Sequence, residues 1–311
     1  MFFDLRRIAL AAPLAALALP ASSATIDVLW LSGNSDYNND IQTLASQAPG
    51  FDPSGDGALT WDLTLWNPGA ALSLAAFDVL VIGSTCNTPS NASNSGNCSG
   101  SGFFGTGVDV GNVLSNKAEI EAARGNRTFI SGQDADWHYT RDSTPGPNVD
   151  DGPKGFLINA VNWAASGTGL GIVSMTDRIF NNNGWWDNDD SFLKDELGGA
   201  AFAFESNTVN IGPGQGGFPI NEGLSSAGLS NWGTSSHACL DPVTGYTAIN
   251  IAPTAAGSCA VTLVTSAGAS GGTSGGDDPD LDPGVIPLPA GGWLLISGMA
   301  AILGLRRRRR V

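Results

Sequence analysis

The sequence predicts an α/β fold built on a doubly wound, mainly parallel flavodoxin-like sheet with β additions late in the chain. Two observations favour this class. Short apolar runs alternate with helix-like segments up to about Met175, as expected where helical crossovers join parallel strands. The run at residues 78–83, DVLVIG, is also apolar on both faces, which is typical of a central parallel strand.

The expected elements follow one another along the chain. Strands are predicted at residues 26–32, 61–66, 78–83, 128–131 and 170–175. Helices are predicted at residues 36–48, at 116–124 and from Pro153 to just before Gly167. Beyond Met175 the pattern indicates a short helix at 192–197 and two late strands, 246–251 and 260–265, that could pair at an edge.

The helix at 116–124 has signals at both ends. Asn116 and Glu119 have the spacing of a capping box, and Gly125 can end the helix. These signals place the next strand beyond Gly125.

The first 24 residues have the organisation of a secretory signal peptide. Arg6 and Arg7 precede an apolar stretch at 8–20, and small residues at 22–24 offer a cleavage site. The mature chain is therefore expected to begin near Thr25, after cleavage by signal peptidase and export.

Export would place the four cysteines in an oxidising compartment. Four cysteines allow three pairings, and we favour the local pairs Cys86 with Cys98 and Cys239 with Cys259. A metal site made of all four is the alternative, although no Cys-x-x-Cys spacing occurs.

The C-terminal 27 residues contain an apolar span. Residues 286–305 carry no charge, and a helix of about 20 residues can cross a hydrocarbon core of about 30 Å. Five arginines follow at 306–310, and such a cluster holds its end in the cytoplasm. We therefore expect a C-terminal transmembrane helix that keeps the body outside the cytoplasm. A buried core helix with a basic end is the alternative.

This tail resembles a known sorting signal. Pro287, Leu288, Pro289 and Ala290, followed by an apolar span and an arginine cluster, are similar to the VPLPA-type relatives of the PEP-CTERM signals read by exosortases, with Ile286 in place of the usual valine. The resemblance covers residues 285–311. It implies a bacterial surface protein, cleaved near these four residues by an exosortase-like membrane enzyme.

The domain organisation follows from these ends. Residues 1–24 are the signal peptide, 25–265 the α/β domain, 266–284 a Gly/Ser/Asp-rich stalk, and 285–311 the sorting motif, transmembrane helix and Arg tail. Without its two ends the chain keeps 7 of its 14 Lys and Arg and 28 of its 29 Asp and Glu, for a net charge of about −21. Such a surface repels nucleic acid and attracts cations.

The body resembles a second family in its strand order. The segments IDVLWLSG, FDVLVIGS and NRTFISGQDADWH, with FLINAVNWA and the later stretch ending in SSHA, look like the class I glutamine-amidotransferase-like fold, particularly its ThuA-like branch, over residues 26–264. Cys86 lies in STCNTPS and lacks the glycine-flanked elbow of the amidotransferase nucleophile. The resemblance therefore implies the fold and not amidotransferase chemistry.

Candidate site residues gather after the strand at 128–131. Ligands of open parallel sheets collect beyond the carboxyl ends of the strands, where His138 follows Asp134 and Asp136. These groups could serve acid–base chemistry or hold a divalent ion, joined by His237 if its loop folds over the same edge. The alternative is a pair of solvated acids and a hydrogen-bonded structural histidine.

A separate calcium site is suggested by Asp52, Ser54 and Asp56. Their spacing matches the first half of an EF-hand loop, but the twelfth position is Leu63 rather than glutamate. A plain acidic turn is the alternative.

Two tryptophans suggest a carbohydrate partner. Trp185 and Trp186 lie beside Asp187, Asp189 and Asp190, so the rings could stack on an extracellular polysaccharide. Core or loop packing is the alternative.

The sequence favours an exported, surface-anchored bacterial protein whose body is a non-catalytic binding or structural domain. No nucleophile motif is intact, since Ser131 and Ser235 lack a Gly-x-Ser-x-Gly elbow. The alternative function is an extracellular hydrolase or sugar-acting enzyme with a ThuA-like fold. It would use His138, Asp134 or Asp136, and His237.

Overall fold

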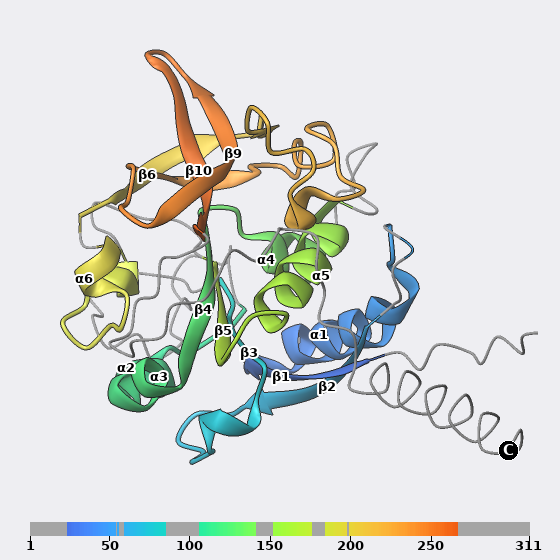
Figure 1. Cartoon of the computed structure of the whole chain (residues 1–311), viewed down its shortest axis with the longest axis vertical. Helices are drawn as coiled ribbons and strands as arrows, with labels where there is room; N and C mark the ends of the chain where they lie inside the picture. The colour runs from blue at the N-terminus through green and yellow to red at the C-terminus, as the bar shows by residue number, and fades with distance from the viewer. Residues whose placement is uncertain are drawn as a thin grey trace, which may run out of the picture.

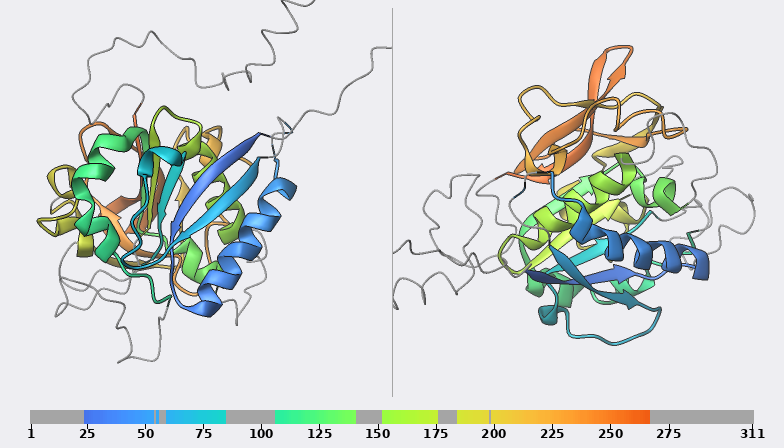
Figure 2. Two further views of the ribbon diagram at one scale, coloured as in Figure 1. Left: turned by 90° about the horizontal axis from the view of Figure 1, so that it is seen from below. Right: turned by 90° about the vertical axis from the view of Figure 1, so that its right-hand side faces the viewer.

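The structure is a computed structural model that describes residues 24–53, 55, 59–84, 106–140, 152–175, 184–197 and 199–266. In this part of the chain one mixed ten-stranded sheet runs through the molecule, with helices against both faces (Figure 1). The right-hand view of Figure 2 shows that the late strands extend the same sheet beyond the parallel strands.

The first five strands form the parallel half of the sheet. They lie side by side in the order β2-β1-β3-β5-β4. Their bounds are β1 Thr25–Leu31, β2 Thr60–Trp66, β3 Val79–Ile82, β4 Arg124–Ser131 and β5 Leu170–Met175. All five are predicted strands, and β5 has its predicted bounds. The strand order is not that of flavodoxin, however, because β5 lies between β3 and β4.

The remaining strands form the antiparallel half. β10 pairs with the outer side of β4, and β8 and then β6 follow, while β9 forms a hairpin with β10 and β7 pairs with β9. Their bounds are β6 Ala201–Ser206, β7 Asn210–Ile211, β8 Ser236–Leu240, β9 Tyr246–Thr254 and β10 Gly257–Thr265. The predicted late pair is therefore real, but it joins the main sheet through β4.

The predicted fold class is wrong in its central claim. The sheet is not a mainly parallel flavodoxin-like one, because five of its strand pairings are antiparallel and four are parallel. The physical reason is the connections. Hairpins and loops rather than helical crossovers join the late strands, and antiparallel pairing needs no crossover.

The predicted membrane-crossing helix is likewise not found. Among the residues that the structure describes, no helix has the length and apolar character needed to cross a bilayer. Residues 286–305, for which that helix was predicted, lie outside the described ranges.

Helices cover both faces of the sheet. α1, α4 and α5 form one layer, and α2 and α3 lie on the opposite side (Figure 1). The helix bounds are α1 Ser35–Gln47, α2 Gly111–Ser115, α3 Lys117–Ala123, α4 Ala135–Thr140, α5 Gly152–Ala165 and α6 Lys194–Leu197. Short 3₁₀ turns are η1 Ala48–Gly50, η2 Leu74–Ala76, η3 Gly184–Asp187 and η4 Pro219–Asn221.

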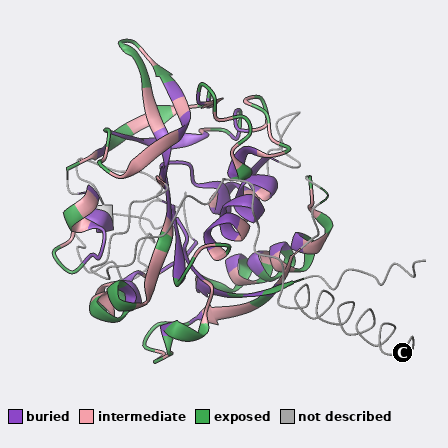
Figure 3. Cartoon of the chain, viewed as in Figure 1, coloured by how far each residue is buried: buried purple, intermediate pink, exposed green. Residues whose placement is uncertain are grey.

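The two longest described helices, α1 and α5, differ in their surroundings. α1 begins where the side chain of Asn34 accepts hydrogen bonds from the N–H groups of Asp36 and Tyr37, at 3.1 and 3.0 Å. It buries one face only, whereas α5 is buried almost all round (Figure 3). α5 is enclosed because the chain around η4 covers its outer side, where Asn159 donates to the carbonyl oxygens of Ile220 and Glu222.

The capping box predicted at Asn116 does not form. The Asn116 side chain donates to the carbonyl oxygen of Asn112 instead, and Glu119 accepts from the N–H of Leu74. The helix ends at Ala123, and Gly125 already belongs to β4. Contacts with neighbouring elements therefore replace the local cap.

Candidate functional site

The candidate site begins where β4 turns into α4. Ser131 ends β4, and three residues later the carbonyl oxygen of Asp134 accepts the N–H of His138 at 3.1 Å, in the first turn of α4. Residues four apart share one face of a helix. This turn therefore brings the side chains of Asp134 and His138 together.

His237 reaches the same place from the antiparallel half of the sheet. It lies on β8, where its N–H donates to the carbonyl oxygen of Gly132 at 2.8 Å. A Cβ on Gly132 would lie 2.3 Å from the carbonyl oxygen of Ala238, so only glycine allows this approach. The sequence places His237 in a loop, and that expectation is wrong.

Asp134, His138 and His237 form one compact group, named here the Asp134 cluster. Asp134 Oδ1 lies 3.1 Å from Nε2 of His138, and Oδ2 lies 3.3 Å from Nε2 of His237. Asp134 is fully buried, and the two histidines are 7% and 4% exposed. Neither oxygen of Asp134 accepts a properly aligned hydrogen bond from a described residue. A buried carboxylate therefore lies between two imidazole rings, with a different oxygen within 3.3 Å of a nitrogen of each ring.

The two histidines have different neighbours. Nε2 of His138 lies 2.8 Å from the carbonyl oxygen of Thr234, and the His138 ring packs against Trp137 and Trp232 at centroid distances of 4.7 and 5.6 Å. Nδ1 of His237 lies 3.9 Å from Oε1 of Glu205, which is on β6. The cluster is therefore enclosed by aromatic rings on one side and borders an exposed carboxylate on the other.

The electrostatics of Asp134 depend on the two histidines. Burial alone would raise the pKa of its carboxyl group, but the adjacent His138 and His237 outweigh burial and lower that pKa well below its usual value. Asp134 therefore stays ionised across the ordinary pH range.

Asp136, which the sequence placed beside Asp134 as a site residue, faces another way. Its carboxylate accepts the N–H of Ser84 at 2.8 Å, the Ser84 hydroxyl, and the Tyr37 hydroxyl at 2.7 Å. Burial raises the pKa of Asp136 despite these bonds. Gly83 permits the contact, since a Cβ there would lie 2.6 Å from Oδ2 of Asp136. Asp136 thus ties α4 to β3 and α1.

The other predicted sites have separate outcomes. Asp52 Oδ1 accepts the N–H of Gly55 at 2.8 Å, whereas Ser54 and Asp56 lie outside the described residues, as do Cys86 and Cys98. The predicted Cys239–Cys259 pair is present, with Cα atoms 5.7 Å apart. Trp185 and Trp186 are buried, so their rings are not available to stack on a sugar.

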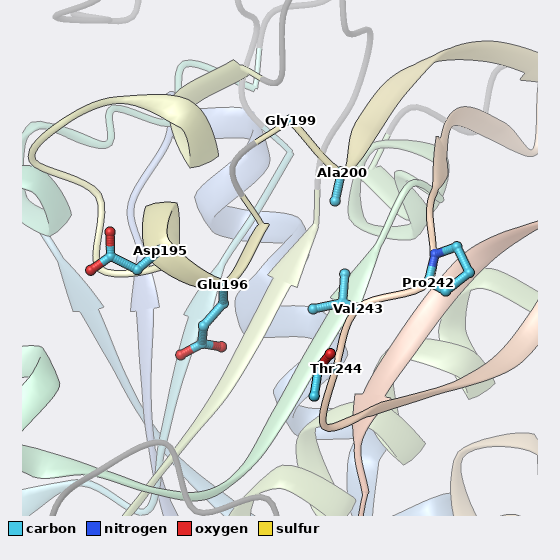
Figure 4. A pocket seen from close by; sticks show the side chains of 7 residues that line it. All are labelled: Asp195, Glu196, Gly199, Ala200, Pro242, Val243 and Thr244. Carbon is cyan, nitrogen blue, oxygen red and sulfur yellow. The ribbon is translucent and has the colours of Figure 1, made fainter.

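A groove elsewhere on the molecule lies between α6 and the β8–β9 connection (Figure 4). It has a volume of about 480 Å³ and is lined by Asp195, Glu196, Gly199, Ala200, Pro242, Val243 and Thr244. Glu196 is already paired with Arg124 and accepts the Tyr246 hydroxyl. Burial lowers the pKa of Arg124, but Glu196 and Tyr246 more than offset this effect and raise it. The contacts among Arg124, Glu196 and Tyr246 join β4, α6 and β9, so the Glu196 carboxylate is already engaged within the protein.

Comparison with known proteins identifies no relative. No family model, no curated protein and no solved structure matches the chain. The assignment of function therefore depends on the geometry of the site.

Two neighbours of the Asp134 cluster could not have been found from the sequence. Glu205 approaches His237 only because β6 pairs with β8, and Thr234 offers a backbone oxygen, for which no residue type is diagnostic. The first contact arises from an antiparallel pairing that the sequence pattern did not reveal, and the second comes from the loop that precedes β8.

Proposed function

We propose that this chain is an exported bacterial protein, delivered to the cell surface by a VPLPA-type sorting signal, whose α/β domain is a non-catalytic binding module. The single observation that carries the binding role is the convergence of Asp134, His138 and His237 at the carboxyl end of β4. Ligands of open sheets collect at this edge.

A non-catalytic role is supported by the surroundings of the cluster. The cluster side chains are almost wholly buried, which leaves little access for a substrate. The hydroxyls of Ser131 and Ser235 are engaged with Thr262 and with the carbonyl oxygen of Asn207. Neither serine is paired with a histidine among the described contacts. These serines therefore lack the base that a serine nucleophile needs.

Export is supported by the Cys239–Cys259 disulfide, because such bonds persist outside the reducing cytoplasm. The acidic body also suits a surface location, where cations or an extracellular polysaccharide would be partners and nucleic acid would not. Signal peptidase and an exosortase-like enzyme would act on residues 1–24 and 285–311.

The masses of the mature ends test this delivery. Protein recovered from the cell surface should begin near Thr25 and end near Pro287 to Ala290. A matched variant with residues 287–290 replaced by Gly and Ser should keep its C-terminus and reach the surface in smaller amounts. Surface protein from the parent chain that retains the arginines at 306–310 would contradict the proposal.

The second candidate is an extracellular hydrolase or sugar-acting enzyme with a ThuA-like fold. It is favoured by the contact between His237 and Asp134, which could orient an imidazole as a general base. A panel of ester and glycoside substrates, assayed with the parent chain and His237→Gln, separates the two functions. Turnover that is lost in this variant would favour the enzyme. Absence of turnover, or turnover unchanged by the substitution, would favour the binding module.

A further inference from the structure

We propose that the Asp134 cluster is the binding site of one divalent transition-metal ion of the zinc type, and that Glu205 orients one of its ligands. This inference builds on the proposed binding role and names the ligand. It requires neither the sorting signal nor surface delivery.

The first argument is spacing. Zinc binds imidazole nitrogen and carboxylate oxygen at about 2.0–2.2 Å, so two ligand atoms of a tetrahedral site lie about 3.3–3.6 Å apart. The separations of Asp134 from His138 and His237 are 3.1 and 3.3 Å. One ligand atom from each of the three residues lies within 4.8 Å of the other two. Small side-chain rotations therefore bring all three onto one ion.

The second argument is the state of the Asp134 carboxylate. It is fully buried, and neither oxygen accepts an aligned hydrogen bond from a described residue. A buried charged group without hydrogen bonds is costly unless it is paired or coordinates a metal. The neighbouring Asp136 is equally buried but accepts hydrogen bonds from Ser84 and Tyr37. Of these two carboxylates, only Asp134 faces the two histidines with which it could share a cation.

The ligand types favour a transition metal over calcium or magnesium. Two imidazole nitrogens and one carboxylate suit zinc and its neighbours in the first transition row, whereas calcium and magnesium prefer oxygen ligands. Asp134, His138 and His237 are also enclosed, with exposed fractions of 0%, 7% and 4%. This enclosure favours an ion that is bound tightly over an ion that binds and releases a substrate.

Glu205 has the position of a positioning residue. Its Oε1 lies 3.9 Å from Nδ1 of His237, while Nε2 of the same ring faces Asp134. Metal-bound histidines commonly direct their second nitrogen toward a carboxylate, which fixes the orientation of the ring. Glu205 is thus placed to take this role at His237, after a small rotation of its exposed side chain that shortens the 3.9 Å contact to hydrogen-bond distance.

A hydrogen bond between His138 and the protein backbone competes with metal coordination. Without a metal, Nε2–H of His138 can donate to the carbonyl oxygen of Thr234, 2.8 Å away. Coordination through this nitrogen requires the neutral ring to carry its proton on Nδ1 instead. Metal binding by the proposed route therefore breaks the contact with Thr234 and changes the tautomer of His138, whereas a purely structural cluster binds nothing.

The test uses the purified chain, expressed without a polyhistidine tag and stripped with EDTA. Zinc chloride is added while the heat of binding is measured by calorimetry. One zinc ion should bind per chain, and an excess of calcium or magnesium chloride should not compete. The chain contains two histidines, so both imidazole NMR signals should shift at one equivalent.

Variants separate the roles. Asp134→Asn should weaken zinc binding at least tenfold, and Glu205→Gln should weaken it about tenfold, as outer-sphere carboxylates do. Asp136→Asn is the matched control, since it makes the same substitution at an equally buried position two residues further along the chain. It should keep a stoichiometry of one.

Three results would overturn the inference. They are no stoichiometric zinc binding by the parent chain, histidine signals that do not move on zinc addition, and an affinity unchanged in Asp134→Asn. The first two use the parent chain and do not depend on how a variant folds. A correctly delivered protein that binds no zinc would contradict only this inference, and a zinc-binding protein with an uncleaved tail would contradict only the delivery.

Discussion

At the scale of single residues, two buried aspartates two positions apart have different roles. Asp134 faces two histidines, and Asp136 faces three donor groups from α1 and β3. Asp134 and His138 were expected to lie close together because both follow β4 in the sequence, but the helix α4 that gives them an i,i+4 spacing was not predicted. The separation of Asp134 from Asp136 could not be predicted, since it depends on where Tyr37 and Ser84 lie in the fold.

Tyr37 should contribute measurably to stability. Its hydroxyl donates to Asp136 and accepts Nε1–H of Trp30 at 2.9 Å, with all three groups buried. Tyr37→Phe leaves the buried Nε1–H of Trp30 without its acceptor and removes one of the three donors to Asp136, and it should lower the free energy of unfolding by about 1–3 kcal/mol. Urea denaturation measures the change.

Tyr139 provides the control for Tyr37. Its hydroxyl donates to Gln47 at 3.3 Å in an exposed position, so Tyr139→Phe should change stability by less than about 0.5 kcal/mol. Equal effects of the two substitutions would show that the buried network around Asp136 contributes nothing of its own.

Asp134 should make the stability of the metal-free protein depend on pH. Its pKa in the folded state is lowered by His138 and His237 against the effect of burial, so the folded protein binds this proton less readily than the unfolded chain. The resulting stabilisation is complete above the unfolded pKa of about 3.9 and is lost as the pH falls further. Urea denaturation in EDTA should show a stability difference between the parent chain and Asp134→Asn that is steady above about pH 4 and shrinks from about pH 4 to about pH 2. A constant difference would contradict the assignment.

At the scale of elements, the sequence identified the strands that are continuous apolar runs. β1, β3 and β5 are of this kind because they are buried on both faces. β8 was missed, although all five of its residues are buried, because SHACL is short and mixes polar with apolar side chains. That omission also hid the position of His237, the part of the site that comes from the other half of the sheet.

The junction between β8 and β10 is narrow. Only Ala260 and Leu240 pair between these strands, and the Cys239–Cys259 disulfide lies directly beside that pair. Replacing both cysteines with alanine should cost about 3 kcal/mol of unfolding free energy, because it frees a loop whose ends are 20 residues apart. Chemical denaturation of the oxidised proteins measures this loss.

The double alanine variant isolates the Cys239–Cys259 bond. Reduction of the parent chain would also break the predicted Cys86–Cys98 bond, whereas the variant leaves these two cysteines unchanged. A variant as stable as the oxidised parent would show that backbone pairing and packing alone hold β8 in place.

At the scale of the whole molecule, charge is the dominant feature. The chain has 29 Asp and Glu against 14 Lys and Arg, and this imbalance was evident from composition alone. Mutual repulsion of like charges destabilises a compact state and is screened by salt. The melting temperature at pH 7 should therefore rise between 10 mM and 0.5 M NaCl.

A pH control identifies the source of the salt effect. Near the sequence pI of about 4.2 the net charge vanishes, so the rise with salt should disappear there. An equal rise at both pH values would indicate a general salting-out effect rather than screening of the acidic surface.

The position of β10 determines when, during folding, the sheet can be completed. β10 is the last strand along the described chain, yet it lies inside the sheet between β4 and β8 (Figure 1). Contacts between distant parts of a chain form late, and translation delivers the N-terminal part first. The parallel strands can associate while the rest of the chain is still emerging, but β8 gains its place beside β10 only when residues 257–265 are available. We therefore expect the Asp134 cluster, which needs His237 on β8, to assemble late in folding. A chain exported in extended form would complete it only after crossing the membrane, with whatever ions that compartment supplies.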